Sequence, residues 1–96
     1  MTVCEVNKNS INYIKTKLGV KKNIVPKLAD KALEKGIKFD DCKGSLKKHL
    51  NGVMKLYDSD DTRILNRKIY LFKNNTLKTV MDLPTDYNEL VKNITK

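Results

Sequence analysis

The stretch RILNRKIYLFKNNTLKTVMDLP, residues 63–84, decides the fold that this sequence predicts. It contains three short runs rich in β-branched, aromatic and large apolar residues, which favour β-strands. The pairs Asn66-Arg67 and Asn74-Asn75 separate these runs, and asparagine tolerates the positive φ that two-residue hairpin turns require. The sequence therefore predicts a meander of three antiparallel strands, over residues 64–65, 69–72 and 77–83.

The two turns also predict how the strands pair, because a hairpin turn sets the register of its strands. The expected cross-strand pairs are Leu65 with Lys68, Ile64 with Ile69, Arg63 with Tyr70, Lys73 with Thr76, Phe72 with Leu77, Tyr70 with Thr79 and Ile69 with Val80. In this register Arg63 and Tyr70 lie on the same face of the sheet.

Helical patterns flank the meander. The clearest covers residues 23–36: Asn23 can cap it, Pro26 suits its first turn and Gly36 ends it. Its apolar stripe comprises Val25, Leu28, Ala29, Ala32, Leu33 and Gly36. We expect Leu28 and Leu33 to be buried, because both lie on this stripe.

The other helices are predicted from shorter patterns. One covers residues 10–19, with Asn9 or Ser10 as its cap. A third opens at residues 39–41 and becomes regular near Ser45, and its expected inner face is Cys42, Leu46, Leu50, Val53, Met54 and Tyr57. A last, short helix follows Pro84, and residues 2–6 form a short strand or an extended arm.

Together these elements predict one α+β domain over residues 1–96. Two or three N-terminal helices pack on one face of a three- to four-stranded antiparallel sheet, and a short helix ends the chain. No apolar stretch approaches the roughly 18 residues of a membrane-spanning helix, and no signal peptide is evident, so we expect a cytoplasmic protein without a membrane partner. Cys4 and Cys42 are expected to be reduced thiols.

The charge indicates a polyanionic partner. The chain has 20 basic and 11 acidic residues, a formal net charge of +9. Residues 1–57 hold 13 basic and 5 acidic residues, whereas residues 58–96 hold 7 and 6, so the helical part carries nearly all the excess. Such a surface favours nucleic acid, a nucleoprotein or an acidic protein surface. The alternative is that the lysines serve solubility alone.

Two rows of lysines are the candidate binding residues. Lys27, Lys31 and Lys35 recur along the second helix, and Lys43, Lys47, Lys48 and Lys55 line the third. If these helices pack side by side, the rows merge into one ridge that meets phosphates without needing a pocket.

Arg63, Arg67, Lys68 and Tyr70 form a second constellation, on the first hairpin. Cations beside a tyrosine can grip phosphate and stack on a base, or support catalysis. The alternative is that they are edge-strand charges above a packed tyrosine. His49 is expected to be a packing residue. No catalytic, cofactor or metal motif is present, so we predict no cofactor and no metal.

The order of helices, then an antiparallel meander, then a short helix resembles the small RelE/ParE-like toxins, some of which cut messenger RNA with clustered Lys, Arg, His and Tyr. The phrases KALEKGI (residues 31–37), IYLF (69–72) and LKTV to LP (77–84) resemble small proteins of Gram-positive bacteria and their phages. Such relatives often carry His and Arg in the first helix. In this chain the same segment is SINYIK (residues 10–15), which contains neither, and this argues against inherited catalysis.

The sequence thus predicts a small, non-enzymatic binding protein of phage or mobile-element type. Its expected partner is nucleic acid or a nucleoprotein, such as a host nuclease complex that it inhibits, as anti-CRISPR proteins do. One alternative is a RelE-like ribonuclease that uses Arg63, Arg67, Tyr70 and His49, which requires these side chains to converge in a cleft. The other is a protein-binding accessory factor, which requires an exposed apolar patch. The oligomeric state stays open.

Overall fold

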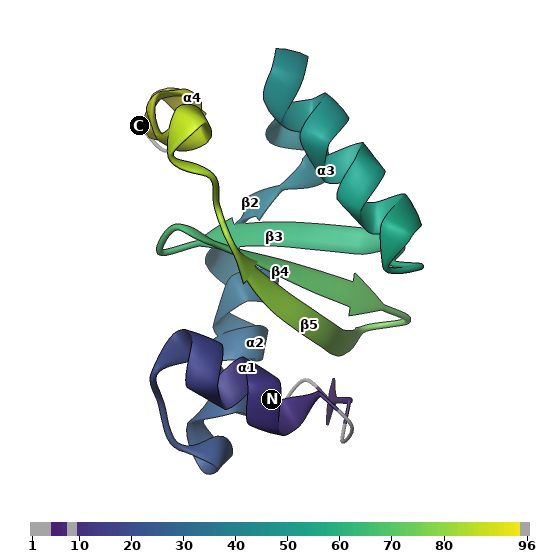
Figure 1. Cartoon of the computed structure of the whole chain (residues 1–96), viewed down its shortest axis with the longest axis vertical. Coiled ribbons are helices and arrows are strands. Elements are labelled where there is room, and N and C mark those ends of the chain that lie inside the picture. Colours follow the sequence, from purple (N-terminus) through teal and green to yellow (C-terminus); the bar gives the residue numbers. More distant parts are fainter. Residues whose placement is uncertain (1–4, 8–9, 95–96) are drawn as a thin grey trace.

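The computed structural model describes residues 5–7 and 10–94, and Cys4 lies outside them. A twisted sheet occupies the centre of the molecule, with helices above and below it (Figure 1). The elements are β1 (Glu5–Val6), α1 (Ile11–Leu18), α2 (Val25–Lys35), β2 (Ile37–Lys38), α3 (Gly44–Leu56), β3 (Asp61–Leu65), β4 (Lys68–Lys73), β5 (Thr76–Asp82) and α4 (Asn88–Ile94). The α+β fold is therefore confirmed.

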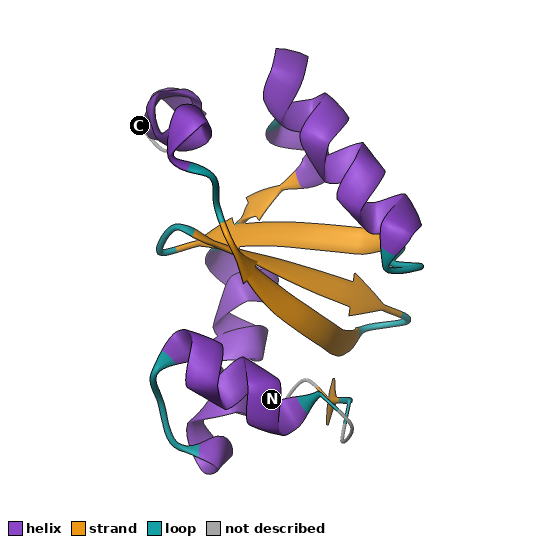
Figure 2. Cartoon of the chain, viewed as in Figure 1, coloured by secondary structure: helices purple, strands orange, loops and turns teal. Residues whose placement is uncertain are grey.

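The sheet has the order β1-β5-β4-β3-β2 (Figure 2). Strands β2 to β5 are antiparallel, and β1 adds a short parallel pairing to β5. Both predicted hairpin turns are present, and each has two residues with positive φ: Asn66 and Arg67 at 51° and 63°, Asn74 and Asn75 at 52° and 65°. Two consecutive left-handed residues suit the right-handed twist of the strands that they join.

The predicted register holds for the first hairpin and fails in part of the second. Phe72 pairs with Leu77 as expected, but Leu71 pairs with Thr79, so Lys78 is an extra residue in β5. Beyond this bulge Tyr70 pairs with Val80 and Ile69 with Met81, and the expected pairs of Tyr70 with Thr79 and Ile69 with Val80 are wrong. A bulge of one residue shifts every later pair by one position.

Helices cover both faces of the sheet. Side chains of α1 and α2 pack with Tyr70, Phe72, Leu77 and Val80 on one face. Leu46 and Leu50 of α3 pack with Ile69 and Leu71 on the other, where Tyr87 and Val91 join them (Figure 1). Two of the N-terminal helices thus share one face, as expected, but α3 covers the other, because β4 buries four consecutive apolar side chains that alternate between the faces.

Helix α2 touches the sheet through small side chains. Val25, Ala29 and Ala32 are fully buried, whereas Leu28 and Leu33 are only half-buried at the edges of the contact. The prediction of full burial for Leu28 and Leu33 is wrong. The predicted Asn23 cap is also wrong, because residues 22–24 form a 3₁₀ turn and α2 begins at Val25 without a side-chain cap.

Gly36 lets α2 approach β3 closely. Its φ of −69° is ordinary, so space rather than backbone conformation explains the glycine. A Cβ atom here would lie 2.5 Å from the carbonyl oxygen of Ala32 and 2.9 Å from the Cβ of Arg63. The chain passes from Gly36 directly into β2, a two-residue strand that the sequence did not predict, which pairs Ile37 with Ile64 and Lys38 with Arg63.

We predict opposite effects of alanine at Gly36 and at Gly52. Gly36→Ala forces backbone atoms apart and should lower the free energy of unfolding by about 1–3 kcal/mol. Gly52 lies within α3, and nothing occupies the space within 4 Å of its missing Cβ. Gly52→Ala should therefore raise the free energy of unfolding by about 0.5–1 kcal/mol through helix propensity. Urea denaturation of both variants measures the difference, and equal midpoints would contradict the close approach.

Candidate binding surface

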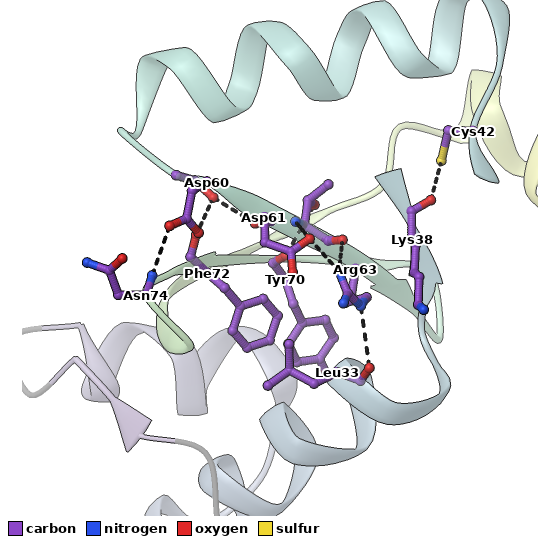
Figure 3. A network of polar contacts seen from close by, with 11 residues as sticks. Leu33, Lys38, Cys42, Asp60, Asp61, Arg63, Tyr70, Phe72 and Asn74 are labelled. Carbon is purple, nitrogen blue, oxygen red and sulfur yellow. Dashed lines mark hydrogen bonds and ion pairs between the residues drawn. The ribbon is translucent and has the colours of Figure 1, made fainter. Parts of the chain in front are cut away.

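Arg63 is part of the framework of the protein (Figure 3). Its guanidinium pairs with the carboxylate of Asp61 and donates to the carbonyl oxygens of Thr62, at 3.0 Å, and Leu33, at 3.4 Å. Leu33 lies in the last turn of α2, where helix carbonyls lack partners and a cation is favourable. The side chain is only 12% exposed, so Arg63 ties β3 to α2 and offers little to a ligand.

The remaining residues of the hairpin constellation do not converge with Arg63 on an open surface. Tyr70 is 1% exposed, and its ring points away from α3 into the core beneath α2 (Figure 3). Burial raises the pKa of its hydroxyl. Arg67 lies exposed in the first hairpin turn, and His49 packs on the opposite face, its ring centroid 5.0 Å from that of Tyr87. Arg63, Arg67, Tyr70 and His49 therefore do not form the cleft that the ribonuclease alternative requires.

A hollow of about 250 Å³ opens beside β2, between Phe39 and Met54. Three of the five charged side chains around it already have partners: Asp61 pairs with Arg63, and a carboxylate oxygen of Asp60 accepts from the backbone amide of Asn74 at 3.1 Å. Residues 5–7 and 10–94 contain no group of three His, Cys, Asp or Glu side chains that could hold a metal ion. The hollow therefore does not select one class of ligand.

Most ion pairs of the protein involve its sheet. The carboxylate of Asp82 in β5 forms ion pairs with Lys17 of α1, at 2.8 Å, and with Lys68 of β4. The carboxylate of Asp58 forms an ion pair with Lys73 at 3.5 Å. In the described part of the chain, no ion pair involves a lysine of the two predicted rows, which are Lys27, Lys31, Lys35, Lys43, Lys47, Lys48 and Lys55. The carboxylates in these pairs thus neutralise cations near the sheet rather than lysines of the two rows.

The two lysine rows lie on opposite sides of the sheet, since α2 packs on one face and α3 on the other (Figure 1). The prediction that they merge into a single ridge is therefore wrong. The rows also differ in composition. Asp30 and Glu34 accompany the lysines of α2, whereas residues 42–57 contain four lysines and no acidic residue. Of the two rows, that of α3 therefore carries the larger net positive charge.

We call Lys43, Lys47, Lys48 and Lys55 the α3 lysine face. All four are exposed, and α3 turns Leu46 and Leu50 inward beneath them. Lys48 and Lys55 are seven residues apart, about 10 Å along the helix axis, with Asn51 and Gly52 exposed between them. The ammonium of Lys47 lies 5.1 Å from the centroid of the Phe39 ring, which steadies it at the side of the face.

Comparison of the chain with protein-family models, curated proteins and solved structures found no match. Among the described residues, no helix has the length and apolar character needed to span a membrane. Cys42 is a free, buried thiol whose sulfur lies 3.4 Å from the carbonyl oxygen of Lys38. The interpretation of the surface therefore depends on its geometry and charge.

Sequence reasoning missed two features of this surface. It treated the two lysine rows as equivalent, although the absence of acidic residues from residues 42–57 could be read directly. It also placed Tyr57 on the inner face of the third helix, and that prediction is wrong: Tyr57 is 43% exposed. The helical period did not reveal that α3 ends at Leu56, where the chain turns away from the helix.

We predict that Arg63 and Arg67 respond differently to lysine, although both substitutions keep the charge. A lysine at position 63 cannot reproduce the three contacts of the guanidinium fork, so Arg63→Lys should lower the free energy of unfolding by about 1–2 kcal/mol. Arg67→Lys, at an exposed turn, should change it by less than about 0.5 kcal/mol. Chemical denaturation compares the two variants, and an unaffected Arg63→Lys protein would argue against this framework role.

The carboxylate of Asp82 should titrate unusually low. Hydrogen bonds from Lys17 and Lys68 lower its pKa to about 2. A carboxyl whose pKa is lowered in the folded state stabilises that state above its unfolded pKa, near 3.9, and loses this contribution as the pH falls towards 2. NMR titration of the side chain should show its midpoint return towards the ordinary value when Lys17 and Lys68 are both changed to methionine. High salt should have a similar but smaller effect, because the side chain is 56% exposed.

Proposed function

We propose that this protein binds nucleic acid through the α3 lysine face. The observation that carries the proposal is the charge of α3: four exposed lysines on one face make no ion pair with any described residue, and α3 itself contains no acidic residue. Phosphate oxygens supply the missing negative charge, and binding them releases condensed counterions, which favours association.

The shape of the surface also favours nucleic acid over a protein partner. Between its exposed lysines, α3 has the small residues Gly44, Ser45 and Gly52. Because these side chains do not project, a phosphate backbone can approach the helix closely. The protein-binding alternative requires a continuous apolar patch. The large exposed apolar side chains of the described residues are instead divided between α1, α3 and α4, on both sides of the sheet.

The resemblance to small phage and mobile-element proteins supplies a setting for this proposal. In that setting the bound nucleic acid can belong to a nucleoprotein, such as a host nuclease complex. The protein would inhibit this complex by blocking its nucleic-acid path, which requires a basic surface but no pocket. The proposal places no catalytic step on any residue of the chain.

We predict that reversing charge on α3 weakens binding strongly, whereas the same reversal on α2 does not. Lys48→Glu with Lys55→Glu should weaken binding to a labelled oligonucleotide by at least about tenfold, because two phosphate contacts are lost. Lys27→Glu with Lys31→Glu changes the net charge equally on the opposite face and serves as the matched control. Fluorescence anisotropy measures both, and circular dichroism verifies that each variant is folded.

The salt dependence provides a second reading of the same experiment. Four phosphate contacts predict that the logarithm of the affinity falls with the logarithm of the salt concentration with a slope of about −3.6 for a duplex or about −2.8 for a single strand, and the α3 variant should roughly halve that slope. If both double variants weaken binding equally, only net charge matters and the proposed face is wrong. Cleavage of the oligonucleotide by the parent protein would instead support the ribonuclease alternative.

A further inference from the structure

Tyr57 stands at the C-terminal end of the α3 lysine face, two residues beyond Lys55. The side chain is 43% exposed, and that of its neighbour Leu56 is 77% exposed. The chain leaves the helix immediately afterwards: Asp58 has a φ of 53°, and the amide of Ser59 donates to the carbonyl of Met54 at 2.8 Å. This turn ends α3 before the sheet can cover the tyrosine ring.

Further lysines surround this end of α3. The Nζ atom of Lys78, the bulged residue of β5, donates to the carbonyl oxygens of Tyr57 at 2.8 Å and Asp58 at 3.3 Å. Lys73 of β4 contacts the carboxylate of Asp58 at 3.5 Å. The end of α3 that carries the exposed ring is therefore bound by lysines of the β4–β5 hairpin, which meets α3 at this side of the molecule (Figure 1), and the carboxylate of Asp58 pairs with one of them.

We propose that the nucleic acid is single-stranded and that one of its bases stacks on Tyr57. This inference rests on the proposed function, because the α3 lysine face holds the phosphates that lead to that base. A cationic surface beside an exposed aromatic ring is the combination that binds single strands, since an unpaired base has a free face for stacking. In a duplex the base faces are already stacked on one another, so only the phosphates remain for α3 to contact.

Tyr13 provides an internal comparison. It is also an exposed tyrosine, at 55%, but it lies on α1, on the opposite side of the sheet from α3. Lys17, one turn further along α1, already pairs with Asp82. Tyr13 therefore matches Tyr57 in exposure but lies on the face away from the α3 lysine face, so it serves as a control for that location.

The test compares a single-stranded oligonucleotide, as DNA and as RNA, with a duplex of equal length and with an abasic strand that keeps only the phosphates. Tyr57→Leu keeps the apolar bulk and removes the ring. It should weaken binding of the single strands by about 5- to 100-fold, the range expected for loss of one base stack, and leave binding of the duplex and the abasic strand unchanged. Tyr57→Phe should retain the affinity, and Tyr13→Leu should change nothing.

Tyrosine fluorescence gives a direct signature of stacking, because the chain contains four tyrosines and no tryptophan. A stacked base should quench the emission of the parent protein, and Tyr57→Phe should bind as tightly without that quenching. If Tyr57→Leu binds single strands as tightly as the parent, the stacking inference is wrong, even when the charge reversal of α3 abolishes binding. If the charge reversal has no effect on single strands or duplex, the proposed function itself fails.

Discussion

The structure depends on β4 being buried on both faces. Ile69, Tyr70, Leu71 and Phe72 are consecutive and almost fully shielded from solvent, so their side chains point alternately to the two sides of the sheet. Each side must then be covered by helices, because a sheet that left either pair exposed would lose the apolar burial that stabilises it. Helices α1 and α2 cover one side, and α3 and α4 cover the other.

This two-sided burial also determines where charge is found. Helices that lay side by side would combine their lysines, but helices on opposite faces keep them apart. The acidic residues also distinguish the two lysine rows: Asp58, Asp61 and Asp82 pair with cations of the sheet and α1, α2 carries its own carboxylates, and α3 carries none. The charge of the α3 lysine face is therefore a product of the whole fold, although each lysine is visible in the sequence.

The local parts of this fold could be predicted from the sequence, and the tertiary parts could not. The two Asn-containing turns have short-range causes, and both form as predicted. The bulge at Lys78 has no local signature, because it is explained by the contact of this lysine with the end of α3. Strand β2 has only two residues, too few to show a strand pattern in the sequence. It also depends on Gly36 fitting closely against β3, which is a tertiary contact.

The candidate site divides in the same way. Periodicity identified the lysines correctly as outward-facing but could not say which helices share a side of the sheet. Arg63 and Tyr70 were correctly paired across the hairpin, yet the pairing did not reveal that α2 would cover both. The exposure of Tyr57 depends on where α3 ends, and helix ends are set by contacts that the sequence does not display.

The pairing of β1 with β5 has a consequence for the order in which the chain folds. Glu5 lies beside Thr76, so this parallel pair joins segments separated by about 70 residues, whereas the hairpin that contains β5 is closed by a two-residue turn. Closing so long a loop costs far more conformational entropy than closing a hairpin. We therefore expect the meander to form first and to present the edge of β5 as a template, which the N-terminal segment can pair with only after β5 has been synthesised.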